Sequence, residues 1–189
     1  MAVAGLAQHK QIEEKLPLLS PTMRTALAAA CAERVLPVLE DYYGERRNEC
    51  RTALDLAWRV ALGEAIPNAE LHAAFDVCER MAEELYDDDE DGATLYALNA
   101  ISFALQTTLV PEVKPADECL SNASDAAHTG DTKRGKDHIN EEADWQLLAL
   151  DVAMRATDIK REMFKHLPSP PRWLTDFYAS GRALSPPIP

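Results

Sequence analysis

Apolar residues recur at spacings of three and four along most of this chain, which is the pattern of amphipathic α-helices. No stretch alternates apolar and polar residues over the length of a strand. We therefore expect an all-α fold. The pattern predicts helices over residues 6–16, 21–43, 45–62, 68–85, 95–109, 115–127 and 140–166, with a last short helix at 173–178.

The helices at 21–43 and 45–62 are expected to form a central hairpin that the other helices cover. Ser20 suits the N-terminal cap of the first helix and Pro21 its first position, where a missing N–H costs nothing. Pro37 is expected to kink this helix or to end it early. Gly63 is expected to end the second helix in a left-handed conformation. The core face of that second helix is predicted to hold Cys50, Leu54, Ala57, Trp58 and Ala61, widened by Val60 and Leu62.

The later helices are predicted from their caps and their apolar faces. Asn68 is expected to cap the helix at 68–85, and Asn140 to cap a helix at 140–166 that would be the longest of the chain. The predicted core face of this long helix consists of Trp145, Leu148, Val152, Ala156, Ile159 and Met163.

The pattern is weakest at residues 111–139. A short helix built on Leu120, Ala123 and Ala127 is expected there, followed by a polar, basic, mobile loop at about 128–139. Residues 182–189 are expected to be a proline-rich tail.

Size and composition favour one domain over residues 1–189, a bundle of six to seven helices around the hairpin. The chain has 189 residues, of which 47% are hydrophobic, so it can bury a sizeable core. It has no run of 18 apolar residues that would predict a membrane span, and its N-terminus lacks the order of a signal peptide. We therefore expect a cytoplasmic protein.

The net charge of −13 bears on possible partners. It argues against binding DNA, RNA or an anionic membrane through general electrostatics, and it favours basic partners. Four widely spaced cysteines, Cys31, Cys50, Cys78 and Cys119, include no C-x-x-C pair. We expect reduced core thiols, with no bound metal and no cofactor.

The most biased segment is residues 76–91, which hold nine acidic residues and one arginine and so have a net charge of −8. One interpretation is a solvated helix end and loop. The other is a docking surface for a basic protein. The acidic residues expected to form that surface are Glu83, Glu84, Asp87, Asp88, Asp89, Glu90 and Asp91.

A second set of charged residues lies on the two hairpin helices: Glu33, Arg34, Asp55 and Arg59. Asp55 and Arg59 are four residues apart and therefore share a helix face. The set is interpreted either as an ion-pair network that holds the helices in register or as a charged pocket.

Motifs for catalysis are not apparent, and we do not expect an enzyme. The main enzymatic alternative is a metal-dependent all-helical nucleotide hydrolase, because residues 83–87 (E-E-L-Y-D) are a distorted version of an E-E-x-x-E magnesium motif. The second acidic pair of such a site is not in place. The five histidines are scattered, and there is no P-loop, G-x-S-x-G or dinucleotide fingerprint.

Several motifs resemble one family. Residues 31–37 (C-A-E-R-V-L-P) resemble the C-x-E-R-x-x-P motif of the YjaG-like family of uncharacterised all-helical bacterial proteins. Residues 54–58 (L-D-L-A-W) resemble that family's L-D-x-x-W segment, and residues 142–148 with Asp158 and Ile159 are similar to its last long helix. The likeness covers residues 10–165 roughly and leaves out the segment after Pro111 and the tail after Pro168.

The same first motif, followed by the arginine-containing stretch at 51–59, also resembles helical immunity proteins encoded beside bacterial polymorphic toxins. This likeness covers mainly residues 20–63. Neither resemblance implies a catalytic residue. Together with the acidity, the second likeness implies a cytoplasmic immunity protein that neutralises a basic toxin by direct contact. The alternative is a YjaG-like housekeeping protein with a different partner.

Overall fold

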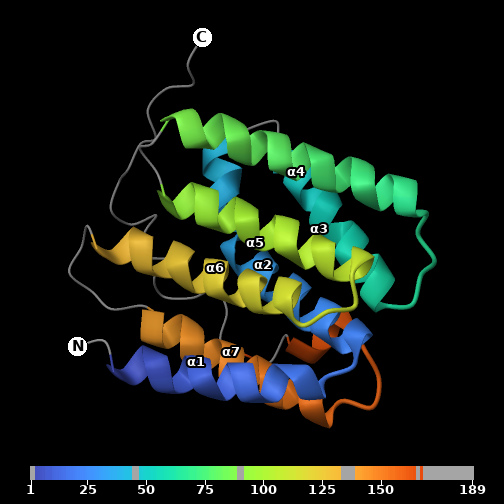
Figure 1. Ribbon diagram of the computed structural model, residues 1–189, viewed down its shortest axis with the longest axis vertical. Coiled ribbons are helices and arrows are strands. Elements are labelled where there is room, and N and C mark those ends of the chain that lie inside the picture. Colours follow the sequence, from blue (N-terminus) through green and yellow to red (C-terminus); the bar gives the residue numbers. More distant parts are fainter. Residues whose placement is uncertain (1–2, 44–46, 89–91, 133–138, 165–166, 168–189) are drawn as a thin grey trace.

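The computed structural model describes residues 3–43, 47–88, 92–132, 139–164 and 167, and these ranges contain helices and no strand (Figure 1). The all-α bundle that the sequence predicts is confirmed. The helices are α1 (Val3–Lys15), α2 (Pro21–Tyr43), α3 (Arg47–Ala61), α4 (Asn68–Asp88), α5 (Gly92–Leu109), α6 (Lys114–Thr132) and α7 (Ile139–Arg155), with 3₁₀ turns η1 (Leu16–Leu18) and η3 (Arg161–Phe164).

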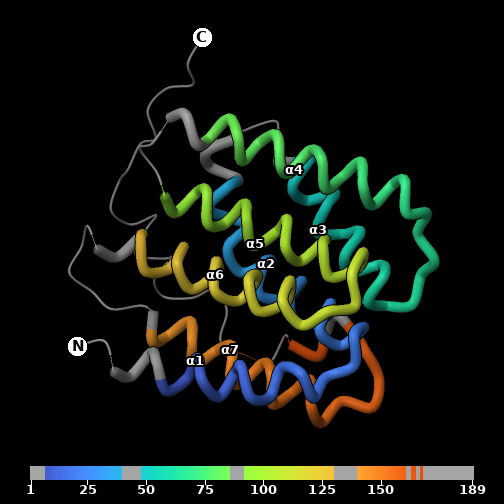
Figure 2. Tube along the Cα trace, in the orientation of Figure 1, coloured from blue at the N-terminus to red at the C-terminus, as the bar shows by residue number. Residues whose placement is uncertain are grey.

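The centre of the molecule is formed by α2 and α5. The helix α5 contacts α2, α3, α4 and α6, and α2 contacts α3, α5, α6 and α7. The expected contact between α2 and α3 is present, but α5, rather than α3, shares the centre with α2. At one edge of the bundle lies α4, and at the opposite edge α1 and α7 lie side by side as a separate layer (Figures 1 and 2).

The helix α2 begins as its sequence predicts. The backbone N–H of Met23 donates to Ser20 Oγ at 3.2 Å, and Pro21 is the first helical residue. The helix continues through Pro37 to Tyr43, so Pro37 does not end it. Its middle is buried on nearly all sides, because a run of small residues lets several helices approach closely. These residues are Ala26, Ala28, Ala29, Ala30 and Ala32.

The predicted core face of α3 is buried, including Trp58 at 2% exposure. The helix ends at Ala61, and Gly63 has a φ of 88°, the left-handed conformation expected of a residue after a helix. Leu62, which was expected to widen the core face, is instead 50% exposed. At the start of α4, the Leu71 N–H bonds to the carbonyl of Pro67, so Pro67 rather than Asn68 is the N-terminal cap residue.

Of the described helices, α5 is the most apolar one, and two of its polar residues, Ser102 and Thr107, have partners on neighbouring helices. Ser102 Oγ donates to Glu79 on α4 at 2.8 Å. Thr107 Oγ1 donates to Thr25 Oγ1 on α2 at 3.0 Å. Within the described ranges, no helix combines the length and the apolar composition needed to cross a bilayer.

The helix predicted at 140–166 is wrong in its extent. The structure ends α7 at Arg155, which leaves α2, with 23 residues, longer than α7, with 17. Thr157 and Asp158 follow, whose short polar side chains compete for backbone hydrogen bonds. The chain then turns so that Phe164 packs against Trp58 and Trp145, with ring centroids 6.3 and 6.5 Å apart.

The prediction of which residues form the core face of this helix is also partly wrong. Trp145 is buried, but Leu148 is 49% exposed. The buried residues of α7 instead follow a face with more polar and small side chains. They are Glu142, Ala143, Trp145, Gln146, Ala149, Leu150 and Ala153.

The short helix expected at 115–127 is longer than predicted. As α6 it continues to Thr132, so the first five residues of the loop expected at 128–139 are helical. Leu120, Ala123 and Ala127 are buried as predicted. Residues 133–138, the helix expected at 173–178 and the tail at 182–189 lie outside the described residues.

Candidate functional site

The outward surface of α4 is strongly acidic. The helix carries seven acidic residues and one arginine, a net charge of −6. The side chains of Asp76, Glu79, Glu83 and Glu84 are exposed, and we call these four the acidic face of α4. They are spaced so that they fall on one side of the helix, at the edge of the bundle (Figure 1).

Two contacts fix parts of the acidic face. Glu79 accepts the hydrogen bond from Ser102, which ties it to α5. The guanidinium of Arg80, the one arginine of this helix, donates through Nε to the carbonyl of Asp76 at 3.3 Å. Asp76 and Glu83 are seven residues apart and lie on the same side of the helix. The acidic face is therefore a carboxylate surface on a regular helix.

The rest of the predicted acidic segment is described only in part. Asp87 and Asp88 belong to the last turn of α4, but their side chains are not among those described. Asp89, Glu90 and Asp91 lie outside the described residues.

Arg34, from the second predicted set, lies in the interior. Its Nε and Nη2 donate to Glu142 Oε2 at 3.1 and 3.0 Å, and its guanidinium lies 4.1 Å from the ring centroid of Trp145. The side chains of Arg34 and Glu142 are 5% and 0% exposed. This buried ion pair joins α2 to α7.

The other members of that set make contacts elsewhere. Glu33 accepts a hydrogen bond from Arg51 at 3.3 Å, which joins α2 to α3. Arg59 donates to Glu64 and lies 3.5 Å from Glu70, across the turn between α3 and α4. The hydrogen bond with Glu64 raises the pKa of Arg59 and lowers the pKa of Glu64. Asp55 is half-buried on α3. Arg34 therefore pairs with α7 in the interior, whereas Arg59 pairs with Glu64 and Glu70 at the turn between α3 and α4.

Sequence reasoning missed the partner of Arg34. Glu142 was not among the predicted site residues, yet it is fully buried. One signal could have found it: Glu142 lies three residues before Trp145, on the same helix face. Arg24 was also missed. It is buried, and it donates to the carbonyls of Leu19 and Pro111.

All four cysteines are buried and reduced. Burial is the largest cause that raises the pKa of Cys31, Cys78 and Cys119 well above the ordinary thiol value. These thiols therefore stay protonated and unreactive in the folded state. Among the described residues, no three His, Cys, Asp or Glu side chains are grouped so that they could hold a metal ion.

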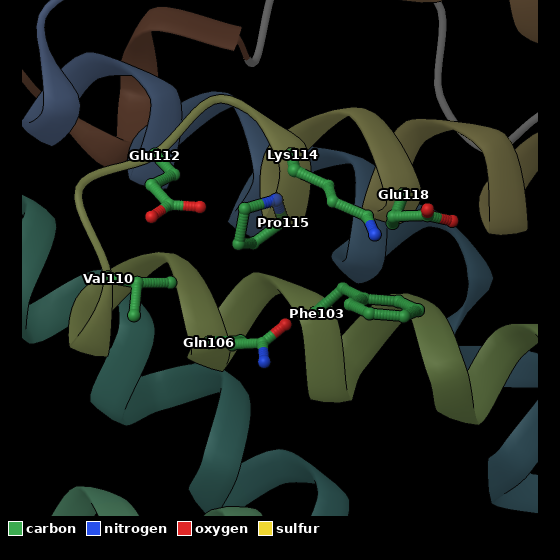
Figure 3. A pocket seen from close by; sticks show the side chains of 7 residues that line it. All are labelled: Phe103, Gln106, Val110, Glu112, Lys114, Pro115 and Glu118. Atoms are coloured by element: carbon green, nitrogen blue, oxygen red, sulfur yellow. The ribbon is translucent and has the colours of Figure 1, made fainter.

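A groove of about 290 Å³ lies between the end of α5 and the start of α6 (Figure 3). Its apolar walls are Phe103 and Val110 from α5 and its following turn, and Pro115 from α6. Polar side chains also line it: Gln106, Glu112, Lys114 and Glu118. The single lysine among two glutamates gives the groove a mixed charge, and its lining contains no serine, threonine, cysteine or histidine.

Comparisons of the chain with protein-family models, with curated proteins and with solved structures found no match.

Proposed function

We propose that this protein is an immunity protein, which binds a basic bacterial toxin domain through the acidic face of α4 and neutralises it by direct contact. The proposal rests on one observation: Asp76, Glu83 and Glu84 are exposed on a regular helix at the edge of the bundle. A helix at an edge can approach a partner without rearrangement of the bundle.

Charge complementarity gives this surface its role. Toxins that act on nucleic acid need a basic active site, and carboxylates presented to that site compete with the phosphates of the substrate. Opposite charges also accelerate association and select against wrong partners. The resemblance of residues 20–63 to helical immunity proteins and the expected cytoplasmic location support the same proposal.

The alternative functions receive less support. A YjaG-like housekeeping role rests on the motif resemblance alone. A metal-dependent nucleotide hydrolase would need a second group of carboxylates close to Glu83 and Glu84. Such a group is not present in the described part of the chain.

The test is a set of association rates against the basic toxin domain encoded directly beside this gene, measured at several salt concentrations. The first variant is Asp76→Asn/Glu83→Gln/Glu84→Gln, which neutralises three exposed carboxylates of the acidic face. The matched control is Glu14→Gln/Glu112→Gln/Asp158→Asn, which changes the net charge equally at exposed positions on other elements.

We expect the first variant to associate at least about tenfold more slowly at low salt and with a weaker salt dependence. The control should associate nearly as fast as the parent protein. Both variants should fold, because exposed charges contribute little to the free energy of unfolding. Equal slowing by both variants would mean that only the total charge matters. Unchanged association of the first variant would remove the acidic face of α4 from the interface.

A further inference from the structure

The layer formed by α1 and α7 has few attachments to the rest of the bundle. The main contacts of α1 are with α7 and with η1. Gln8 donates to Asp144 at 2.8 Å, and Lys15 bonds to Asp151 at 3.0 Å. Both bonds join residues 136 positions apart, so the two helices run parallel, as Figure 2 shows. The position of α1 therefore depends on that of α7.

The inner face of α7 is poorly suited to hydrophobic docking. Its large buried apolar side chains are Trp145 and Leu150, with Leu147 and Val152 half-buried against the core, and the remaining buried positions are alanine, Glu142 or Gln146. Hydrophobic stabilisation scales with the apolar area removed from water, so alanines contribute little. The central helix α5, in contrast, buries large aliphatic residues along its length, including Leu98, Ile101 and Leu105.

Polar contacts also hold α7 in place, beside the contact of Trp145 with Phe164. Gln146 Nε2 donates to the carbonyl of Leu120 and to Ser124 Oγ on α6, at 2.9 and 3.1 Å. Arg34 bonds to one carboxylate oxygen of Glu142, and the other oxygen, Oε1, is buried and accepts no hydrogen bond from the described residues. A buried carboxylate with one oxygen unsatisfied is costly. The closed position of α7 therefore depends on Arg34.

We propose that α1 and α7 open together as a cover over the rest of the bundle, with the Arg34–Glu142 ion pair as its latch. Opening exposes the surface of α2 and α6 beneath α7. Cys31 on α2 lies one turn before Arg34. Cys119 on α6 precedes Leu120, whose carbonyl is bonded by Gln146, and its Sγ donates to the carbonyl of Ala28 on α2 at 3.3 Å. Cys50 and Cys78 lie instead on α3 and α4, which pack on α5 and on each other.

The chain thus contains its own reporters, two thiols on the helices that the cover contacts and two on helices away from it. The experiment measures the alkylation rate of each cysteine in the native protein by mass spectrometry, together with amide hydrogen exchange. We expect the amides of α1 and α7 to share one opening free energy, lower than that of α2 and α5. Cys31 and Cys119 should react through this same opening, faster than Cys50 and Cys78, which should react only on global unfolding.

Two variants separate the cover from global unfolding. Glu142→Gln removes the latch and should accelerate the alkylation of Cys31 and Cys119 on the order of 100-fold. Leu71→Ala leaves a cavity in α4, which stays folded when the cover opens. This variant should accelerate the alkylation of Cys50 and Cys78 by roughly 30-fold or more and leave the alkylation rates of Cys31 and Cys119 unchanged.

The proposal fails if Leu71→Ala accelerates all four thiols equally, because global unfolding would then be the one opening that exposes them. It also fails if α1 and α7 exchange with unrelated free energies, or if Glu142→Gln leaves the reaction of Cys31 unchanged. Should Glu142→Gln not fold, the exchange pattern of the parent protein and the Leu71→Ala variant still decide the question.

Discussion

Phe164 lies within ring-contact distance of two buried tryptophans that come from different parts of the chain. Its ring is tilted by 51° to that of Trp58 and by 44° to that of Trp145. Tilted aromatic pairs at such centroid distances are favourable beyond their burial. The three rings therefore join α3, α7 and η3 in one apolar contact.

Trp58→Ala is expected to lower the free energy of unfolding by about 3–5 kcal/mol, because it removes a large buried side chain and leaves a cavity next to Phe164. Urea denaturation measures this loss. Leu62→Ala, one turn further along and 50% exposed, is the matched control. It should change the free energy of unfolding by no more than about 0.5 kcal/mol. A similar small effect for Trp58→Ala would contradict its role in the core.

The buried ion pair of Arg34 with Glu142 gives a second prediction about single residues. Arg34→Met and Glu142→Leu should each lower the free energy of unfolding by about 3–5 kcal/mol, because each leaves one buried charge without its partner. The double variant should lose less than either single variant, because no unpaired charge remains. A double-mutant cycle from urea denaturation measures the coupling. Additive losses would show that the two charges act independently.

The sequence identified Arg34 as notable but not its partner. The residue lies in a motif beside Glu33, and the nearest candidate partners in the sequence are on the following helix. Its actual partner, Glu142, is 108 positions away. Such a pairing depends on how α2 and α7 cross, and no local pattern encodes that. The exposure of Glu83 and Glu84 was easier to predict, because a dense run of acidic residues is accommodated at the surface.

Among the elements, α2 has the clearest local start signal. Ser20→Ala is expected to lower the free energy of unfolding by about 1 kcal/mol, because the Met23 N–H loses its acceptor. Ser20→Asp keeps a capping oxygen and should retain most of the stability. Thermal denaturation of the two variants checks this. Equal losses would mean that the cap contributes nothing specific.

Helix starts and ends were predictable where the chain carries strong local signals. Examples are Ser20 and Pro21 at the start of α2 and Gly63 after the end of α3. The end of α7 could not be predicted, because the apolar spacing continues past Arg155 to Met163. Contact of Phe164 with Trp58 and Trp145 prevails over that local pattern, and this contact exists only in the assembled bundle.

The pH dependence of stability belongs to the whole molecule. Partial desolvation raises the pKa of half-buried Asp117 and of the more exposed Asp125 above the usual 3.8, while His9 acts in the opposite direction on both and His128 does so on Asp125. When the pKa of a carboxyl group is raised in the folded state, the folded state binds more protons than the unfolded state at pH values between the usual and the raised pKa. These two carboxylates therefore destabilise the fold when charged, and this cost disappears as the pH falls through their raised pKa values.

Asp117→Asn/Asp125→Asn should accordingly gain stability over the parent protein as the pH rises from about 4 to 7. Urea denaturation at several pH values measures the difference. Glu64→Gln serves as a control of opposite sign, because the pKa of Glu64 is lowered by Arg59. Its contribution is present at neutral pH and is lost as the pH falls. A difference between the double variant and the parent that does not change with pH would contradict the raised pKa values.

The pairing of α1 with α7 also sets an order of events during synthesis. The bonded residues of these two helices are 136 positions apart. At translation rates of about 5–20 residues per second, α7 follows α1 from the ribosome after roughly ten seconds. The main helical neighbour of α1 is α7. Ile12 and Leu16, which are buried in the folded protein, therefore remain without the cover of α7 throughout that interval. A helix made early therefore reaches its final place only after nearly all the others.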